Sequence, residues 1–373
     1  MTNVNEDPVM TRVQPDVTGN VLTSLVNTGT WSDPEGAAVT LAASLGNVTK
    51  NSDGTWSWSL TPSAKLTDQI VTITASDEDG GTSSVSFTVT AKVAVPNQQI
   101  YHKGSSFAGT SVDAAIDPGK ILARPGAAPL PLSYANLINS SRGLNGIVID
   151  VAGLVDTSLS AADFSFKMSP QGGYDETLNP PSAWAAAPVP TAIVVTPGTA
   201  TIPARVRLEW PDNAIANRWL QVAVLANART GLDTAALSYV GHLQGEVNGQ
   251  VSNGRFRVTA ADLTPVSGQI GATVTVGSVL DIVKDGRIRN TDITAVSSQI
   301  GVRELRLITI PAAGSGGHGT FGPGTSGPSL QSGASGGGSS IDFAALAAWA
   351  GAQQVSQPDM PAGTPTGNAK PKR

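Results

Sequence analysis

The stretch that decides the fold is "AVTLAASLGNVTKNSDGTWSWSLTP", residues 38–62. Apolar side chains alternate with polar ones on both sides of its centre, at Val39, Leu41, Trp56 and Trp58. A period of two residues is typical of half-buried β-strands. The segment "NSDG" between the two runs indicates a tight turn in which Gly54 can take a positive φ. The stretch therefore predicts strands joined by a tight turn.

The same alternation extends outward through residues 1–95. The segment "QIVTITASDEDGGTSSVSFTVTA", residues 69–91, predicts two more strands around an acidic loop that is rich in glycine. Roughly six or seven short strands within about 90 residues indicate an immunoglobulin-like sandwich. We therefore expect residues 1–95 to form a first β-sandwich.

Three segments of this region carry a family resemblance: "TGTWSDPEGAAVTL", "NSDGTWSWSLTP" and "VTITASDEDGGTSSVSFTVT". They resemble the cadherin-like and PKD-like repeats of large bacterial surface proteins, over residues 5–92. The resemblance implies that loop carboxylates at the end of the module bind Ca²⁺, which prefers oxygen ligands. The residues concerned are Asp33, Asp77 and Asp79. A second interpretation stays open, in which Asp and Gly simply form β-turns there.

The composition fits a chain of short strands and many turns. Of 373 residues, 40% are apolar and only 14% are charged, and there are 41 Gly and 25 Pro. The net charge of −5 contains no block of like charge, which argues against a nucleic-acid or membrane-surface partner. The chain has no cysteine, so disulfides and thiolate zinc sites are excluded. No apolar run reaches the roughly 18 residues of a membrane helix, so we expect no membrane insertion.

Residues 96–245 predict a second and larger β-sandwich. Its expected strands lie in "GIVIDVAGL", "ADFSFKM", "TAIVVTPG", "ARVRLEWPD", "RWLQVAVLAN" and "ALSYVGHL". The segments "YANLINSSRGLNGIVIDV" and "WPDNAIANRWLQVAVLANARTGL" resemble a domain found just ahead of dockerin modules in large bacterial secreted proteins. No activity follows from that resemblance.

A ten-residue phrase occurs twice, as "DLTPVSGQIG" at residues 262–271 and as "DITAVSSQIG" at residues 292–301, with seven identical positions. In the second copy, Ile293, Val296 and Ile300 fall on one face of a helix that begins at Asp292, and Gly301 can end it. The repeat therefore predicts two short helices thirty residues apart.

The second copy follows "DIVKDGRIRNTD", residues 281–292, which has the spacing of an EF-hand calcium loop. Asp occupies positions 1, 5 and 12, Gly occupies position 6, and position 7 contributes a backbone carbonyl. An apolar residue at position 8, here Ile288, is expected to anchor the loop to its neighbour. The equivalent loop of the first copy keeps Val258 and Asp262 but has lost its other ligands, unless Glu246 or Asn248 replaces them in an irregular register.

The paired units resemble a type I dockerin over residues 246–311. The resemblance implies Ca²⁺ as a structural ion, held by Asp281, Asp285, Asp292 and the carbonyl of Arg287. It also implies that the helices bind a cohesin-like domain or another surface protein. Val283 departs from the family at position 3. Two interpretations stay open: one working metal site in the second loop, or a helix pair that has kept its packing and lost its metal.

The remaining residues, 312–373, are mostly Gly, Ser, Thr and Pro, so we expect a disordered tail with a short helix near residues 341–354. The expected fold is therefore mainly β: two tandem β-sandwiches, a small α-helical module with two loop–helix units, and this tail. The N-terminus lacks the features of a signal peptide, and we interpret the chain as the back part of a longer exported protein.

Catalysis is not expected. The three histidines are scattered, no Ser lies in a nucleophile elbow, and carboxylates such as Glu209 and Asp212 form no recognisable pair. We therefore predict a non-enzymatic adhesion or assembly protein outside the cell or on its surface. The alternative is a carbohydrate-binding accessory region of a polysaccharide-degrading enzyme, in which tryptophans of the middle sandwich stack on a glycan.

Overall fold

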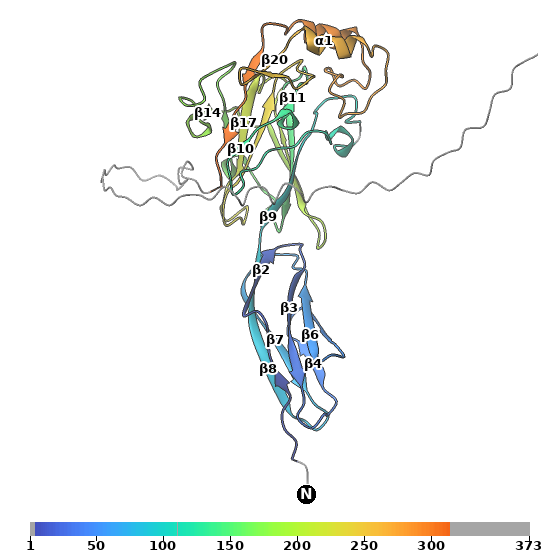
Figure 1. Ribbon diagram of the computed structural model, residues 1–373, viewed down its shortest axis with the longest axis vertical. Coiled ribbons are helices and arrows are strands. Elements are labelled where there is room, and N and C mark those ends of the chain that lie inside the picture. The colour runs from blue at the N-terminus through green and yellow to red at the C-terminus, as the bar shows by residue number, and fades with distance from the viewer. Residues whose placement is uncertain (1–3, 110, 314–373) are drawn as a thin grey trace, which may run out of the picture. The chain divides into compact units, whose positions relative to one another are not determined.

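The first β-sandwich consists of two four-stranded sheets. The structure is a computed structural model, and it describes residues 4–109 and 111–313. The strand orders are β1-β3-β6-β5 and β2-β8-β7-β4 (Figure 1). The strands are β1 (Val9–Met10), β2 (Asp16–Asn20), β3 (Leu25–Ser32), β4 (Thr40–Ala43), β5 (Asn47–Lys50), β6 (Thr55–Leu60), β7 (Leu66–Ser76) and β8 (Thr82–Lys92).

The turn predicted at "NSDG" is confirmed. Strands β5 and β6 pair antiparallel with Lys50 opposite Trp56, and Gly54 has a φ of +80°. Trp56 and Trp58 point inward and are 0% and 1% exposed. The ring of Trp58 meets Phe87 of the opposite sheet edge-to-face, with 4.9 Å between centroids. The alternation in the sequence thus placed both tryptophans in the core between the sheets.

The second β-sandwich contains all six strands that the sequence predicts. Its sheets have the orders β15-β16-β12-β9 and β11-β18-β17-β13-β14. The strands are β9 (Ala94–Ile100), β11 (Leu137–Ile138), β12 (Gly146–Ala152), β13 (Phe164–Met168), β14 (Ala185–Ala186), β15 (Ala192–Thr196), β16 (Ala204–Glu209), β17 (Arg218–Val224) and β18 (Ala236–His242). Four 3₁₀ turns lie between them, at Asp113–Ala115, Tyr134–Asn136, Ala161–Asp163 and Pro181–Ala183.

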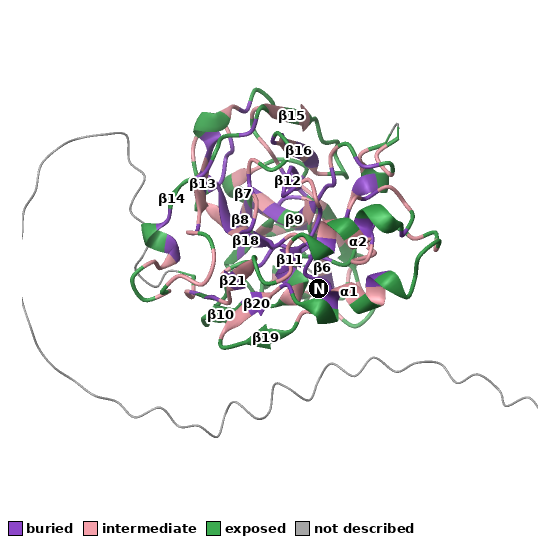
Figure 2. Cartoon of the chain, turned by 90° about the horizontal axis from the view of Figure 1, so that it is seen from above, coloured by how far each residue is buried: buried purple, intermediate pink, exposed green. Residues whose placement is uncertain are grey.

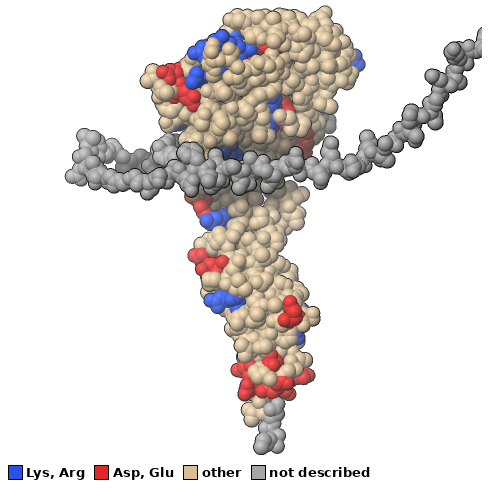
Figure 3. Space-filling view, viewed as in Figure 1, with Lys and Arg blue, Asp and Glu red and all other residues tan. Residues whose placement is uncertain are grey.

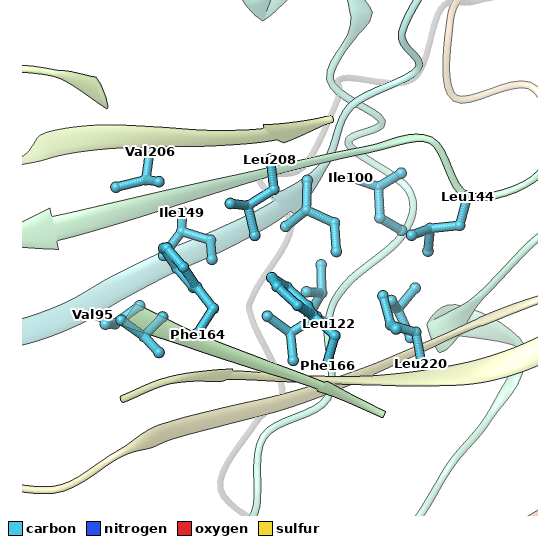
Figure 4. Close-up of a cluster of buried hydrophobic side chains, with 14 of the residues drawn as sticks. Val95, Ile100, Leu122, Leu144, Ile149, Phe164, Phe166, Val206, Leu208 and Leu220 are labelled. Atoms are coloured by element: carbon cyan, nitrogen blue, oxygen red, sulfur yellow. The ribbon is translucent and has the colours of Figure 1, made fainter. Parts of the chain in front are cut away.

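Apolar side chains from both sheets fill the space between them (Figure 4). Ile149 and Leu208 come from one sheet, and Phe166 and Leu220 come from the other. Strand β12 is buried along its whole length, because its outer face is covered as well: Val148 packs there in a small separate cluster. A strand buried on both faces reads as a continuous apolar run.

The two short helices predicted from the repeat are present, as α1 (Ala260–Ser267) and α2 (Asn290–Ser297). Each begins two residues before the repeated Asp, because that Asp is the third helical residue rather than the first. Around them lie the three-stranded sheet β19 (Val251–Ser252), β20 (Arg255–Arg257) and β21 (Glu304–Arg306), and the pair β10 (Leu130–Pro131) and β22 (Thr309–Ile310).

The helices share a buried core with the second sandwich. Trp219 and Tyr239 of the sandwich belong to the same apolar cluster as Phe256, Val266 and Val296. The indole Nε1 of Trp219 donates to the Arg306 carbonyl at 2.7 Å, and β10 pairs with β22. Residues 246–310 are therefore built onto the sandwich, while the boundaries of a separate module remain a prediction from sequence.

Two further expectations concern helices. The short helix predicted near residues 341–354 lies outside the described residues. Within residues 4–109 and 111–313, the helices are too short to cross a bilayer.

Candidate functional site

The two loop–helix units hold each other through reciprocal backbone pairing. Ile288 exchanges hydrogen bonds of 2.8 and 3.0 Å with residues 271–272, which follow the other helix. Val258, the matching residue of the first unit, does the same with residues 301–303 at 3.0 and 3.1 Å. The prediction that Ile288 anchors its loop to the neighbouring unit is confirmed. The sequence duplication therefore corresponds to a duplicated structure with two-fold character.

Each repeated Asp joins the start of its loop to the start of its helix. Asp262 and Asp292 are both fully buried, and each accepts an amide from the helix cap and an amide from the loop; Asp262 also accepts the Asn248 amide at 3.3 Å. The donors are the amides of Thr259 and Val247 for Asp262, and of Arg289 and Val283 for Asp292, at 2.8–3.0 Å. A buried carboxylate that accepts two amides satisfies its charge through hydrogen bonds, as burial requires.

The other predicted ligands of the second loop are also occupied by the protein itself. Asp281 is fully buried and accepts the amides of Asp285 at 3.1 Å and Gly286 at 2.8 Å. The carboxylate of Asp285 accepts the Arg287 amide and pairs with Arg289 at 3.3 Å. Arg287, at loop position 7, forms an isolated antiparallel bridge with Thr273 of the other unit.

The second loop does not fit a calcium ion in this arrangement. Position 3 is Val283, which has no side-chain oxygen, and its amide is directed at Asp292. Asp285 is paired with Arg289, which leaves Asp281 and Asp292 as the remaining carboxylates. Within the described parts of the chain, no three His, Asp or Glu side chains are grouped so that they could hold one metal ion.

The first loop contains a buried carboxyl group that sequence reasoning named only for an irregular register. Glu246 is 0% exposed, and its Oε1 accepts the Gly249 amide at 2.8 Å. Its Oε2 is buried and has no hydrogen-bond partner. Burial, and then the nearby Asp262, raise the pKa of Glu246 to about 8, so the group carries a proton at neutral pH. The irregular register arises because strands β19 and β20 are inserted between Glu246 and Asp262.

The outer faces of the two helices match each other and are exposed. Figure 2 shows both helices with exposed residues on their outer sides, and α1 and α2 pack against one another. The exposed hydroxyl residues occupy equivalent places in the repeat: Thr264 and Ser267 in α1, Thr294 and Ser297 in α2. Each hydroxyl donates to a carbonyl of its own helix, at 2.8–3.3 Å. We call these four residues the hydroxyl face. Its side chains are small and uncharged.

The acidic loops of the first sandwich are both tied to residues 5–7. Asn5 donates to Asp77 at 3.2 Å, and the Glu6 amide donates to Glu35, which follows Asp33 in its loop. Figure 3 shows acidic side chains gathered at this end of the first sandwich. The sequence indicated the loops but gave no sign that an N-terminal segment links them.

Within these loops the carboxylates close turns. Asp77 accepts the amides of Asp79 at 2.9 Å and Gly81 at 2.8 Å, and Asp33 accepts those of residues 35 and 37. Asp79 itself is exposed. The turn interpretation therefore accounts for most of the geometry. One oxygen, Oδ2 of Asp33, is buried without a hydrogen-bond partner.

The residues weighed as catalytic have structural partners. Glu209 pairs with Arg207 at 2.7 Å, and Asp212 pairs with Arg142 at 2.8 Å. His242 is fully buried; its Nδ1 accepts the Asn217 amide and its Nε2 donates to the Ser140 carbonyl, at 2.9 and 2.7 Å. Burial lowers the pKa of His242 to about 4. Through these contacts, all three side chains help to hold the fold together.

The comparison with protein families identifies the first sandwich. Residues 4–90 match the bacterial Ig domain. The match supports the Ig-like part of the resemblance found in the sequence and covers nearly the same residues. Bacterial Ig domains are typically non-catalytic and are often extracellular or on the cell surface. This family match ends at residue 90, so the dockerin resemblance over residues 246–311 stays a prediction.

Solved structures of tandem Ig domains are similar to this chain at low identity. The titin Ig tandem domains are 9% identical, with 65% of this chain and 99% of that chain covered and a TM-score of 0.22. The titin domains z1z2 in complex with telethonin are 12% identical, with 65% and 98% covered and a TM-score of 0.23. The N-terminal Ig1-2 module of the Drosophila receptor DLAR is 9% identical, with 64% and 98% covered and a TM-score of 0.20. TM-scores this low do not establish a shared fold. No curated protein matches the chain.

Proposed function

We propose that this chain is a non-catalytic part of a modular adhesion or assembly protein, located outside the cell or on its surface. In this proposal the bacterial Ig domain serves as a structural module, and the second sandwich carries the binding surface. The bacterial Ig match over residues 4–90 supports the modular and extracellular setting. The ion pairs of Glu209 and Asp212 support the non-catalytic assignment, because paired carboxylates have given up their role as free acid or base.

The hydroxyl face is the feature of the structure that best supports a binding role. The inner sides of α1 and α2 are fixed in the core by Val266 and Val296, which are both 0% exposed. The outer sides therefore present Thr264, Ser267, Thr294 and Ser297 on a rigid support. Small uncharged side chains allow the backbone of a partner to approach closely, and a rigid surface loses little entropy on binding. We assign a protein partner to this face, of the cohesin-like class that the sequence resemblance implies.

Surface plasmon resonance tests this assignment. The full chain is immobilised and exposed to a panel of cohesin domains. We expect at least one to bind, and we expect the double variant Thr264→Arg/Thr294→Arg to weaken that binding at least about tenfold, since two bulky charges meet the interface. Ser63→Arg, an exposed change in the first sandwich, is the matched control. If no cohesin binds, or if the double variant binds as the wild type does, the assignment is wrong.

The rival function, glycan binding by the middle sandwich, finds little support in its aromatic residues. Trp184, Trp210 and Trp219 are 4%, 0% and 0% exposed. In the described part of the chain, every Trp is buried or half-buried, so none offers the open ring face on which sugars stack. A glycan array decides the matter: specific sugar binding that survives Thr264→Arg/Thr294→Arg would favour the rival.

Calcium is proposed as a structural ion only at the acidic end of the bacterial Ig domain. The unpartnered Oδ2 of Asp33 and the acidic loops held by residues 5–7 support the proposal. Since fewer than three acidic groups converge there, water would complete most of the ligand shell and binding would be weak. Hydrogen exchange of the full chain tests it: excess calcium should slow exchange in residues 33–37 and 77–82, and Asp33→Asn should abolish the effect. Unchanged exchange in both loops would remove calcium from the account.

A further inference from the structure

Lys284, the fourth residue of the loop at residues 281–292, is a lysine buried inside the protein. It is 2% exposed, and its backbone has a φ of +60°, which few residues other than glycine adopt. Its Nζ donates to the carbonyls of Val276 at 2.9 Å and Ser278 at 2.8 Å. A buried lysine is rare unless its charge is compensated. One explanation should account for both the left-handed backbone and the buried side chain of Lys284.

Three buried carboxylates offset part of this cost. Burial lowers the pKa of Lys284, and the charges of Asp117, Asp281 and Asp292, which are 3%, 0% and 0% exposed, act in the opposite direction. Two other titratable groups face the same region: His102, whose pKa is lowered by burial, contacts Asp117 at 3.2 Å, and Lys120 donates its Nζ to the Tyr134 carbonyl. Lys284 is the one that belongs to the loop itself. Its carbonyl also accepts the Ser106 amide at 3.1 Å, which fixes the loop to the second sandwich.

We propose that the ammonium of Lys284 is the internal cation of this loop, so that residues 281–292 fold and stay closed without a metal ion. A dockerin-like loop needs a positive charge to hold its buried Asp residues together. Here that charge is covalently attached, and the ligand set for calcium is incomplete at Val283 and Asp285. A divalent ion entering the loop would also be repelled by the ammonium, within a region of low dielectric constant. The disagreement with the calcium expectation is thus explained by a replacement of one cation by another.

Hydrogen exchange of the full chain, read at residues 281–292, tests the proposal with and without excess calcium. We expect the wild-type loop to exchange equally fast in EDTA and in calcium. We expect Lys284→Met to exchange about 100-fold faster in EDTA, because removing one partner leaves buried carboxylates uncompensated. Excess calcium should leave the exchange of this variant unchanged as well, because the ligand set stays incomplete at Val283 and Asp285. Lys92→Met, at an exposed lysine, is the matched control.

Two results would overturn the proposal: slower wild-type exchange in calcium, or unchanged exchange of Lys284→Met in EDTA. If Lys284→Met does not fold, Lys284→Met/Asp281→Asn replaces it. This double variant removes the cation together with one of its carboxylates, so the proposal expects it to fold and to be more stable than Lys284→Met. Equal instability of both variants would contradict a role for Lys284 as a counter-charge.

Discussion

At the scale of single residues, burial decides which groups of this protein respond to pH. Glu246 and His242 are both fully buried, and each is held in its neutral form. Burial raises the pKa of Glu246 to about 8 and lowers the pKa of His242 to about 4. The free energy of unfolding should therefore fall as the pH rises towards about 8, because of Glu246. It should also fall as the pH drops towards about 4, because of His242.

Glu246→Gln should make the protein more stable than the wild type at alkaline pH. Between about 4.5 and 8, folded Glu246 keeps a proton that the unfolded chain releases, so the free energy of unfolding falls as the pH rises through this range. A glutamine has no such proton to lose. Urea unfolding at about pH 6 and about pH 9 measures the difference. A wild-type chain that is as stable as Glu246→Gln at the higher pH would show that the fold does not raise the pKa of Glu246.

His242→Gln should flatten the acid side of the stability curve. Folded His242 stays neutral while the unfolded side chain takes up a proton, so the free energy of unfolding falls as the pH drops from about 6.5 to about 4. The variant should also lose about 1–3 kcal/mol at neutral pH, because the Asn217 amide and the Ser140 carbonyl lose their partners. Denaturant titrations over that pH range measure both effects. The same acid slope in the variant would assign the effect to another group, of which His102 is the next to test.

At the scale of elements, the strand pair β5–β6 and the repeated helix starts carry the most information. The strand pair supplies Trp56 and Trp58 to the core of the bacterial Ig domain. The helix starts depend on Asp262 and Asp292, which have equivalent hydrogen bonds in the two units. Both features were readable from the sequence, because a period of two and a repeat with seven of ten identical positions can be recognised without knowledge of distant contacts.

Trp58→Ala should cost the bacterial Ig domain about 3–5 kcal/mol. The substitution removes the contact with Phe87 and the hydrogen bond from Nε1 to the Leu45 carbonyl, and it leaves a cavity. Calorimetry of the full chain should show a lower melting temperature for the first sandwich. Trp31→Ala is the comparison, since Trp31 is only half-buried, and its effect should be smaller. Equal effects of both substitutions would contradict the assignment of Trp58 to the core.

Asp262→Ala and Asp292→Ala should destabilise their helices to a similar extent, about 1–3 kcal/mol each. Each substitution leaves two amides without an acceptor inside the protein. Hydrogen exchange in residues 260–267 and 290–297 reports the two helices separately. A much larger effect at one site would show that the duplicated units are not equivalent in energy, whatever their geometry.

At the scale of the whole molecule, the sequence predicted the individual strands and helices but not the packing of the helices onto the second sandwich. The strands and both helices followed from periodicity and repetition. The shared core did not, because β10 pairs with β22 and Trp219 donates to Arg306 across separations that leave no local signal. The burial of Lys284 was missed for a related reason. A lysine in a loop is normally exposed, and the sequence gives no sign that Ser106, 178 residues earlier, contacts this one.

We infer from the shared core that α1 and α2 belong to the same cooperative unit as the second sandwich, so that their outer faces are presented on a rigid support. Native-state hydrogen exchange in increasing denaturant tests this most directly, by comparing residues 260–267 and 290–297 with strands β17 and β18. We predict that helices and strands lose protection together, with the same dependence on denaturant. Helices that open at a clearly lower denaturant concentration, while the strands stay protected, would contradict the claim.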